Sequence, residues 1–174
     1  MTELSPEGIL APFPIGGECD HGTMLKLQVG ERDSGFACGS YGPLALSLWD
    51  RAATVEDARA AATLLRTMFT TKSDVLVLAV LGPDTPPPGN DIREIISKAL
   101  QEIRPKLRGS ATVVEGQGFR AAALRAAMLG MSMIVRSDHK SFATVTEAAA
   151  FLSPLSDELS TNDVVRAVSQ LRER

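Results

Sequence analysis

Cys19, Asp20 and His21 are consecutive residues of types that bind metal ions. Thiolate, carboxylate and imidazole groups are all competent zinc ligands. The chain holds one further histidine, His139, and it has no paired Cys-x-x-Cys or His-x-x-x-His spacing that would complete a tetrahedral site. We therefore interpret this trio as a chance grouping, and we expect no metal site and no cofactor.

A glycine-containing turn at Gly116, Gln117, Gly118 and Arg120 offers a different chemistry. Glycine allows a ligand to approach the backbone closely, the free N–H groups of a following helix attract an anion, and an arginine would neutralise it. The third glycine of a dinucleotide fingerprint is missing, and no Gly-Lys-Ser or Gly-Lys-Thr occurs after the turn. Two interpretations stay open: a small-ligand or nucleotide site, and a tight turn ahead of a buried helix.

Residues 82–91 form a proline-rich loop with the sequence Gly-Pro-Asp-Thr-Pro-Pro-Pro-Gly-Asn-Asp. Three consecutive prolines hold an extended segment at low entropic cost, beside the start of a predicted helix. One interpretation is a rigid connection between a strand and a helix. The other is a surface that binds a protein partner, and its expected contact residues are Asp84, Thr85, Pro86, Pro87, Pro88, Asn90, Asp91, Arg93 and Glu94.

A convincing catalytic constellation is missing from the sequence. Hydrolysis through a covalent intermediate needs a nucleophile, a base and a group that orients the base. No Gly-x-Ser-x-Gly elbow or similar motif frames a serine or a cysteine. We expect a non-catalytic protein, and an enzyme whose site is assembled from residues far apart in the sequence is the remaining alternative.

The composition is that of a globular protein. The 174 residues suit a single domain, with 44% hydrophobic residues and a net charge of -3. Because 18 basic residues face 21 acidic ones without a long basic run, nucleic acid is not an expected partner. The start of the chain does not resemble a secretory signal, and no stretch approaches the roughly 20 apolar residues of a membrane span. We expect a cytoplasmic protein in which Cys19 and Cys38 are free thiols.

Hydrophobic patterns predict alternating strands and helices. Extended segments are expected at 24–29 and 36–49. The second of these is either one bulged strand or two strands, of which the later is 44–49. Further strands are expected at 75–81, 111–115 and 140–143. Helices are expected at 54–69, from about 91 to 104, at 119–130 and from 144 to 152, with a final helix capped by Asn162 or Asp163. Thr54 with Asp57, Asp91 with Glu94, and Thr144 with Glu147 match capping boxes.

This alternation predicts an α/β fold, with a small, mainly parallel mixed sheet flanked by helices. We expect an N-terminal arm over 1–23, the α/β domain over 24–153 and a C-terminal helical appendage over 154–174. The alanine-rich helix at 119–130 carries apolar residues around most of its circumference, so it must be covered on more than one side. Packing beneath the C-terminal helix and a homodimer interface both satisfy that requirement.

The segment from Leu44 to Leu152 resembles the STAS domains, the sulphate-transporter and anti-sigma-factor-antagonist family, and in particular their divergent bacterial relatives. Three stretches carry the resemblance: Trp-Asp-Arg-Ala-Ala-Thr-Val-Glu-Asp at 49–57, Val-Val-Glu-Gly-Gln-Gly-Phe-Arg-Ala-Ala-Ala at 113–123, and Phe-Ala-Thr-Val-Thr-Glu-Ala-Ala-Ala-Phe-Leu at 142–152. The resemblance implies a regulatory module that switches protein partners, often through phosphorylation of a serine where the third strand meets the next helix. Thr85 is the one hydroxyl residue in the matching loop and hence the candidate for phosphorylation.

Overall fold

The computed structural model describes residues 25–119, 121–126 and 139–173. Within these ranges the strands are β1 (Leu27–Arg32), β2 (Phe36–Tyr41), β3 (Leu44–Trp49), β4 (Val75–Leu81), β5 (Leu107–Val114) and β6 (His139–Phe142). The helices are α1 (Val55–Thr71), α2 (Asn90–Ile103), α4 (Val145–Leu152) and α5 (Thr161–Glu173), with short 3-10 turns at Arg104–Lys106 and Ser153–Leu155. Residues 121–126 are also helical.

The described strands form one mixed sheet in the order β1-β2-β3-β4-β5-β6. β1 with β2 and β2 with β3 are antiparallel, whereas the three remaining pairs are parallel. The α/β class and the mainly parallel sheet predicted from the sequence are thus confirmed. Residues 36–49 form two strands rather than one bulged strand, and they turn at Gly42, whose φ of 58° suits glycine.

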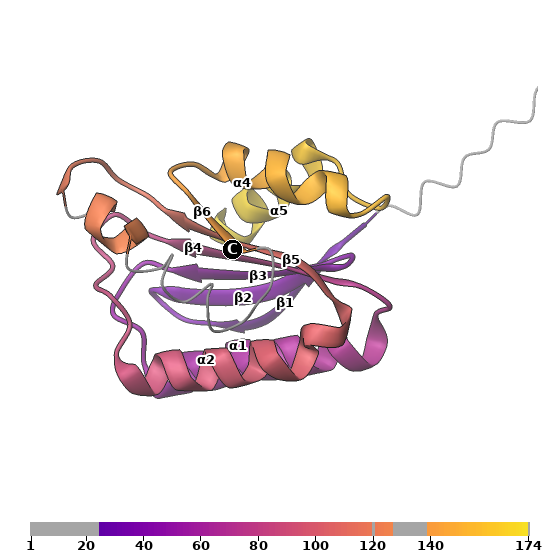
Figure 1. Cartoon of the computed structure of the whole chain (residues 1–174), viewed down its shortest axis with the longest axis horizontal. Coiled ribbons are helices and arrows are strands. Elements are labelled where there is room, and N and C mark those ends of the chain that lie inside the picture. The colour runs from indigo at the N-terminus through magenta and orange to yellow at the C-terminus, as the bar shows by residue number, and fades with distance from the viewer. Residues whose placement is uncertain (1–24, 120, 127–138, 174) are drawn as a thin grey trace, which may run out of the picture.

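Helices cover the sheet in two layers (Figure 1). α1 and α2 lie on one face, and α4 and α5 lie on the other. α5 was predicted to be an appendage, yet it belongs to the same hydrophobic core as β2, β3 and β4. Val164, Ala167, Val168 and Leu171 are buried in that core together with Leu44 and Leu46.

Local capping chemistry explains where most of these helices begin. Thr54 and Asp57 exchange side-chain and backbone hydrogen bonds at the start of α1, and Thr144 and Glu147 do so at α4, which confirms both predicted capping boxes. The box predicted for Asp91 and Glu94 is wrong. α2 is preceded by Gly89 as its N-cap residue, without a side-chain cap, and Asp91 already lies within its first turn.

The cap of α5 also differs from the prediction. Asn162 was one expected cap, but the capping hydroxyl belongs to Ser160, which accepts from the backbone N–H of Asp163 at 3.2 Å. The Asp163 carboxylate accepts in return from the backbone N–H of Ser160 at 3.0 Å. The expected start of the helix is therefore correct to within about one turn, while the residue that caps it lies further upstream.

Several predictions lie outside the described residues. These are the arm over 1–23, the trio of Cys19, Asp20 and His21, and the second half of the helix predicted at 119–130. Cys38 is a free, buried thiol, and burial raises its pKa. Among the helices that the structure describes, none has the length and apolarity to cross a bilayer.

Candidate functional site

The carboxyl ends of β3, β4 and β5 bring the loops of interest to one edge of the sheet. Trp49 pairs with Leu81, and Leu81 pairs with Val114, so the segments that follow the three strands start side by side. The turn before β2 lies at the same edge, because Phe36 is the partner of Trp49. In sheets with parallel strands, ligands characteristically bind beyond these ends.

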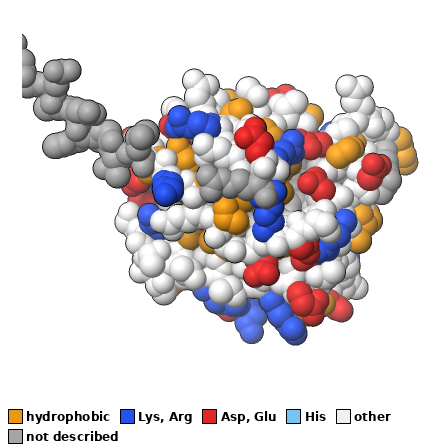
Figure 2. All heavy atoms as spheres, turned by 180° about the vertical axis from the view of Figure 1, so that it is seen from behind, with side chains coloured by type: hydrophobic (Ala, Val, Ile, Leu, Met, Phe, Trp, Pro, Cys, Tyr) orange, Lys and Arg blue, Asp and Glu red, His pale blue; other side chains and the backbone are white. Residues whose placement is uncertain are grey.

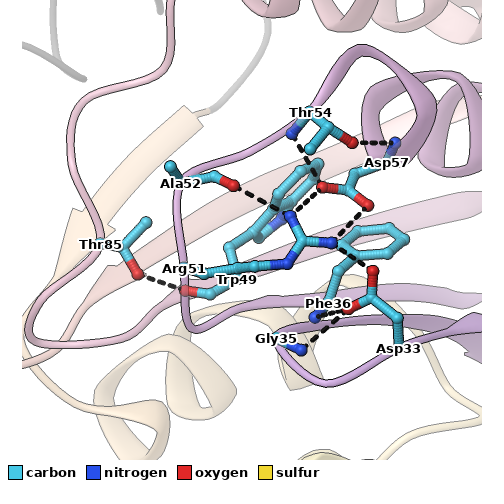
Figure 3. A network of polar contacts seen from close by, with 9 residues as sticks. All are labelled: Asp33, Gly35, Phe36, Trp49, Arg51, Ala52, Thr54, Asp57 and Thr85. Atoms are coloured by element: carbon cyan, nitrogen blue, oxygen red, sulfur yellow. Dashed lines mark hydrogen bonds and ion pairs between the residues drawn. The ribbon is translucent and has the colours of Figure 1, made fainter.

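An ion-pair network built on Arg51 organises this edge (Figure 3). The guanidinium donates to Asp57 at the start of α1, at 2.7 and 3.1 Å, and also to Asp33 in the turn before β2. Asp33 additionally accepts from the backbone N–H groups of Gly35 and Phe36, each at 2.8 Å. Arg51 therefore joins the β1–β2 turn to the first turn of α1.

The electrostatics of the network keep both carboxylates charged. Hydrogen bonds from Gly35, Arg51 and Phe36 lower the pKa of Asp33. Burial acts to raise the pKa of Asp57, but the bonds from Arg51 and Thr54 outweigh it, and the net shift is downward. The arrangement is that of a structural clamp, because every charged group in it already has a partner.

The proline-rich loop is fixed to the sheet from within. The Thr85 hydroxyl donates to the carbonyl of Trp49 at 2.5 Å (Figure 3). The Gly82 amide donates to the same carbonyl at 2.8 Å. Gly82 also lies close to Asp50, because a Cβ atom at this position would come within 2.6 Å of Oδ1 of the Asp50 side chain. The loop is therefore held rigidly at the end of β4.

This geometry divides the predicted contact residues into three groups, which are buried, half-buried and exposed. Thr85 is only 2% exposed and donates its hydroxyl proton internally, so the folded loop does not present it to a kinase, contrary to the role that the family resemblance implies. Pro86 and Pro88 are half-buried. The remaining predicted contact residues are exposed: Asp84, Pro87, Asn90, Asp91, Arg93 and Glu94.

The glycine-containing turn lies against the proline-rich loop. Gly116 and Gly118 have φ angles of 95° and 89°, and a Cβ atom on Gly116 would be 3.1 Å from Cβ of Pro83. These contacts support the interpretation of a tight turn. Gln117 is exposed, and Arg120 lies outside the described residues. The neighbouring carboxylate of Glu115 is paired with Arg172 at 2.7 Å.

The described residues 121–126 of the helix after this turn do not pack beneath the C-terminal helix, which was one of the two predicted ways of covering it. Ala121 and Leu124 are buried in a cluster with Phe36 and Val114, on the opposite side of the sheet from α5, so these residues do not pack beneath the C-terminal helix. Phe119 is 89% exposed, and Ala122, Ala123 and Ala126 are exposed as well.

A cavity of about 110 Å³ lies between the sheet and helices α1 and α2. Its walls are mainly apolar and include Leu64 of α1, Ile96 of α2 and Val77 of β4. Thr85, Pro86 and Pro88 also line it, so the inner side of the proline-rich loop forms part of this cavity.

Ser110 and His139 are among the polar residues of the cavity wall. They are register partners on β5 and β6, and Oγ of Ser110 lies 2.9 Å from Nδ1 of His139. Burial lowers the pKa of His139 and favours the neutral imidazole. Its Nε2 atom is buried and has no hydrogen-bond partner among the described residues. A nucleophilic relay would need a carboxylate at that position to orient the ring.

A second hollow, of about 390 Å³, lies at the carboxyl edge of the sheet. Arg32, Asp33, Asp50, Glu115 and Arg172 bring charges of both signs to its wall. Asp33 forms an ion pair with Arg51, and Glu115 forms one with Arg172. In the ranges that the structure describes, no group of three or more His, Cys, Asp or Glu side chains has an arrangement that could hold a metal ion.

Sequence reasoning missed the Ser110–His139 pair and the Arg51 clamp. The pair depends on strand register, because 29 positions separate the two residues in the chain. The clamp had a faint signal, namely an arginine three positions before the predicted helix cap at Thr54. Nothing in the local pattern indicates that Asp33 would join it.

Comparison with known proteins leaves the family open. No protein-family model matches this chain, and no curated protein matches it either.

Proposed function

We propose that this chain is a non-catalytic regulatory module that binds a protein partner through the exposed side of residues 82–91 and the first turn of α2. The observation that carries the proposal is the way the loop is held. Thr85 and Gly82 anchor its inner side to the end of β3, while Pro87, Asn90 and Asp91 face solvent. A preformed surface loses little conformational entropy on binding, which favours affinity.

The chemistry of the exposed residues suits a partner of mixed polarity. Pro87 supplies an apolar contact, and Asp91, Arg93 and Glu94 supply charges of both signs around it. Figure 2 shows that acidic and basic side chains are also interspersed over the face it displays. The resemblance to STAS domains supports the same location, since their regulation centres on the junction between the third strand and the next helix. A cytoplasmic location is part of this proposal.

The non-catalytic part of the proposal is supported by the titratable groups. The described carboxylates with lowered pKa values, which are Asp33, Asp57, Glu102 and Asp163, each accept a hydrogen bond from an arginine. Catalytic acids and bases are usually poised near the working pH, whereas these shifts move the carboxylates away from it.

Affinity capture with matched variants tests the proposal. The triple variant Pro87→Ala, Asp91→Ala, Glu94→Ala changes only exposed residues of the surface. The control variant Pro154→Ala, Asp157→Ala, Glu158→Ala removes the same residue types and charge at an exposed site before α5. Tagged full-length chains are used to capture proteins from extract of the source cells, and the captured proteins are quantified by mass spectrometry.

We expect the surface variant to reduce recovery of a stoichiometric partner about tenfold, the equivalent of ~1.4 kcal/mol, and the control to leave recovery unchanged. Circular dichroism should show both variants folded. Equal recovery of the partner by the wild type and the surface variant would contradict the proposal.

A further inference from the structure

The cavity beneath α1 and α2 is an unusual feature of an otherwise close-packed sheet. On the face toward α4 and α5, β4 buries Leu76, Leu78 and Val80 almost completely. On the other face it presents Val77 and Ala79, which line the cavity and are only partly buried. A central parallel strand is normally covered on both faces, so open space above these two residues needs an explanation.

Strand register explains the space. Ser47, Ala79 and Thr112 lie side by side on β3, β4 and β5, and each has a small side chain. Two residues further along the same three strands, toward the carboxyl edge, lie Trp49, Leu81 and Val114, which are large and buried. The cavity therefore comes from a patch of small residues specified by the sequence, bounded at one end by bulky ones.

The size and walls of the cavity indicate the kind of molecule that fits. Its volume of about 110 Å³ greatly exceeds the ~10–15 Å³ that one water molecule needs. Leu64 and Leu65 of α1 and Ile96 and Leu100 of α2 form its roof, opposite the sheet. Water is poorly held in such surroundings because few wall atoms can hydrogen-bond to it, whereas an apolar body gains contacts.

His139 adds one polar requirement. A neutral imidazole carries a single N–H group and a single lone pair, and Nδ1 uses one of them with Ser110. Nε2 retains the other, buried and without a described partner. Buried polar atoms are rarely left unpaired in native proteins, and His139 lines the cavity, so a group bound there is the partner that we infer for this atom.

We propose that this cavity binds a small uncharged molecule with an apolar body and one hydroxyl or carbonyl group, which hydrogen-bonds to His139. A charged group is disfavoured inside because the cavity wall offers it no buried charge of opposite sign. Arg93 lines the cavity, but its side chain is exposed and donates a hydrogen bond to Asn90. An anion paired with Arg93 would therefore stay in contact with water outside the cavity. The proposal goes beyond the protein-binding function and does not depend on it.

Three matched fluorinated probes test the proposal in ¹⁹F NMR titrations of the full-length chain. 4-Fluorophenol carries a neutral hydroxyl, 4-fluorotoluene is apolar, and 4-fluorobenzoate is anionic. We expect saturable binding of 4-fluorophenol, about fivefold weaker binding of 4-fluorotoluene, and no saturable binding of 4-fluorobenzoate. Absence of saturable 4-fluorophenol binding at millimolar concentration would overturn the proposal.

Variants locate the binding. Ala79→Leu fills the cavity and should abolish binding of 4-fluorophenol, whereas Ala150→Leu, at an exposed position of α4, should leave it unchanged. His139→Asn should remove the preference for 4-fluorophenol over 4-fluorotoluene. Undiminished binding to a folded Ala79→Leu variant would place the probe elsewhere and refute the site.

A measurement on the wild-type chain guards against the failure of a variant to fold. The chain has only two histidines, His21 and His139, so their imidazole NMR signals are readily assigned by comparison with His139→Asn. 4-Fluorophenol should shift the His139 signals and leave those of His21 unchanged. A shift confined to His21 would count against the proposal.

Discussion

The guanidinium of Arg51 lies across the carboxylate of Asp57, with Nη1 2.7 Å from Oδ2 and Nη2 3.1 Å from Oδ1. The same carboxylate accepts from the backbone N–H of Thr54 at 2.8 Å. The buried side chain of Asp57 thus completes the cap of α1 and fixes the loop after β3. The start of α1 and the end of β3 should therefore be stabilised together.

Replacing Asp57 with alanine should lower the free energy of unfolding by roughly 1–3 kcal/mol, because the cap is lost and Arg51 loses its main partner. Urea denaturation followed by circular dichroism measures the change. Arg66→Ala is the control, since it breaks the solvent-exposed pair with Glu102, which should contribute much less. Equal losses in the two variants would show that the Arg51–Asp57 pair has no special role.

Stability should also depend on pH through Asp57. Its pKa in the folded protein is below the ordinary value of 3.8, so the unfolded chain binds the proton more readily. The stabilisation by the carboxylate is fully present above that value and is lost as the pH falls through the lower, folded pKa. The difference in unfolding free energy between wild type and Asp57→Asn should be constant from pH 7 to about 5 and shrink in more acidic solution.

His139 should produce a separate dependence on pH. Burial lowers its pKa below the ordinary 6.5, so between the folded and unfolded values the unfolded chain again binds more protons. Wild-type stability should fall as the pH drops below about 6.5, and His139→Asn should reduce that slope. Unfolding curves at half-unit pH intervals test this prediction, and identical slopes for both proteins would contradict it.

Thr85→Asp should destabilise the folded chain by about 3 kcal/mol, because it places a carboxylate at a site that is 2% exposed and opposite the carbonyl of Trp49. Thr85→Ser retains the hydroxyl and serves as the control. Thermal unfolding measures both variants. If Thr85→Asp were as stable as wild type, the loop would have to open readily, and phosphorylation at Thr85 would again be feasible.

Gly39→Ala should cost roughly 1–3 kcal/mol, since its Cβ atom would lie 2.6 Å from the backbone oxygen of Gln28 on the neighbouring strand. Gly30→Ala, in the neighbouring strand β1, is the matched control, because a Cβ atom there meets no atom closer than 3.4 Å. Denaturant midpoints of the two variants give the comparison. A similar midpoint for both would mean that β1 moves away at little cost.

Local patterns made much of the fold predictable. The continuous apolar run of β4 and the capping pairs at Thr54 and Thr144 act over a few residues, and the structure confirms them. The start of α2 was predicted to within about one residue, but its cap was misassigned, because an acidic pair at 91 and 94 also fits the first turn itself, where negative charge is favourable without any cap.

The cavity was beyond local reasoning for a different reason. Ser47, Ala79 and Thr112 occur on separate strands, and only the register places their small side chains together. The Ser110–His139 contact likewise requires the pairing of β5 with β6. The burial of Thr85 depends on the carbonyl of Trp49, which lies 36 positions earlier in the chain.

The packing of α5 on β2 and β3 has a consequence for synthesis of the chain on the ribosome. Leu44 and Leu46 are made early, but the Val168 and Leu171 side chains that join them in the core are made last among the described segments. Until α5 emerges from the ribosome, one face of the antiparallel pair β2 and β3 remains accessible to chaperones and to other nascent chains. We therefore expect this domain to finish folding only after α5 has left the ribosome. Ribosome-bound chains stalled before Thr161 should be markedly more sensitive to protease than chains in which α5 has emerged.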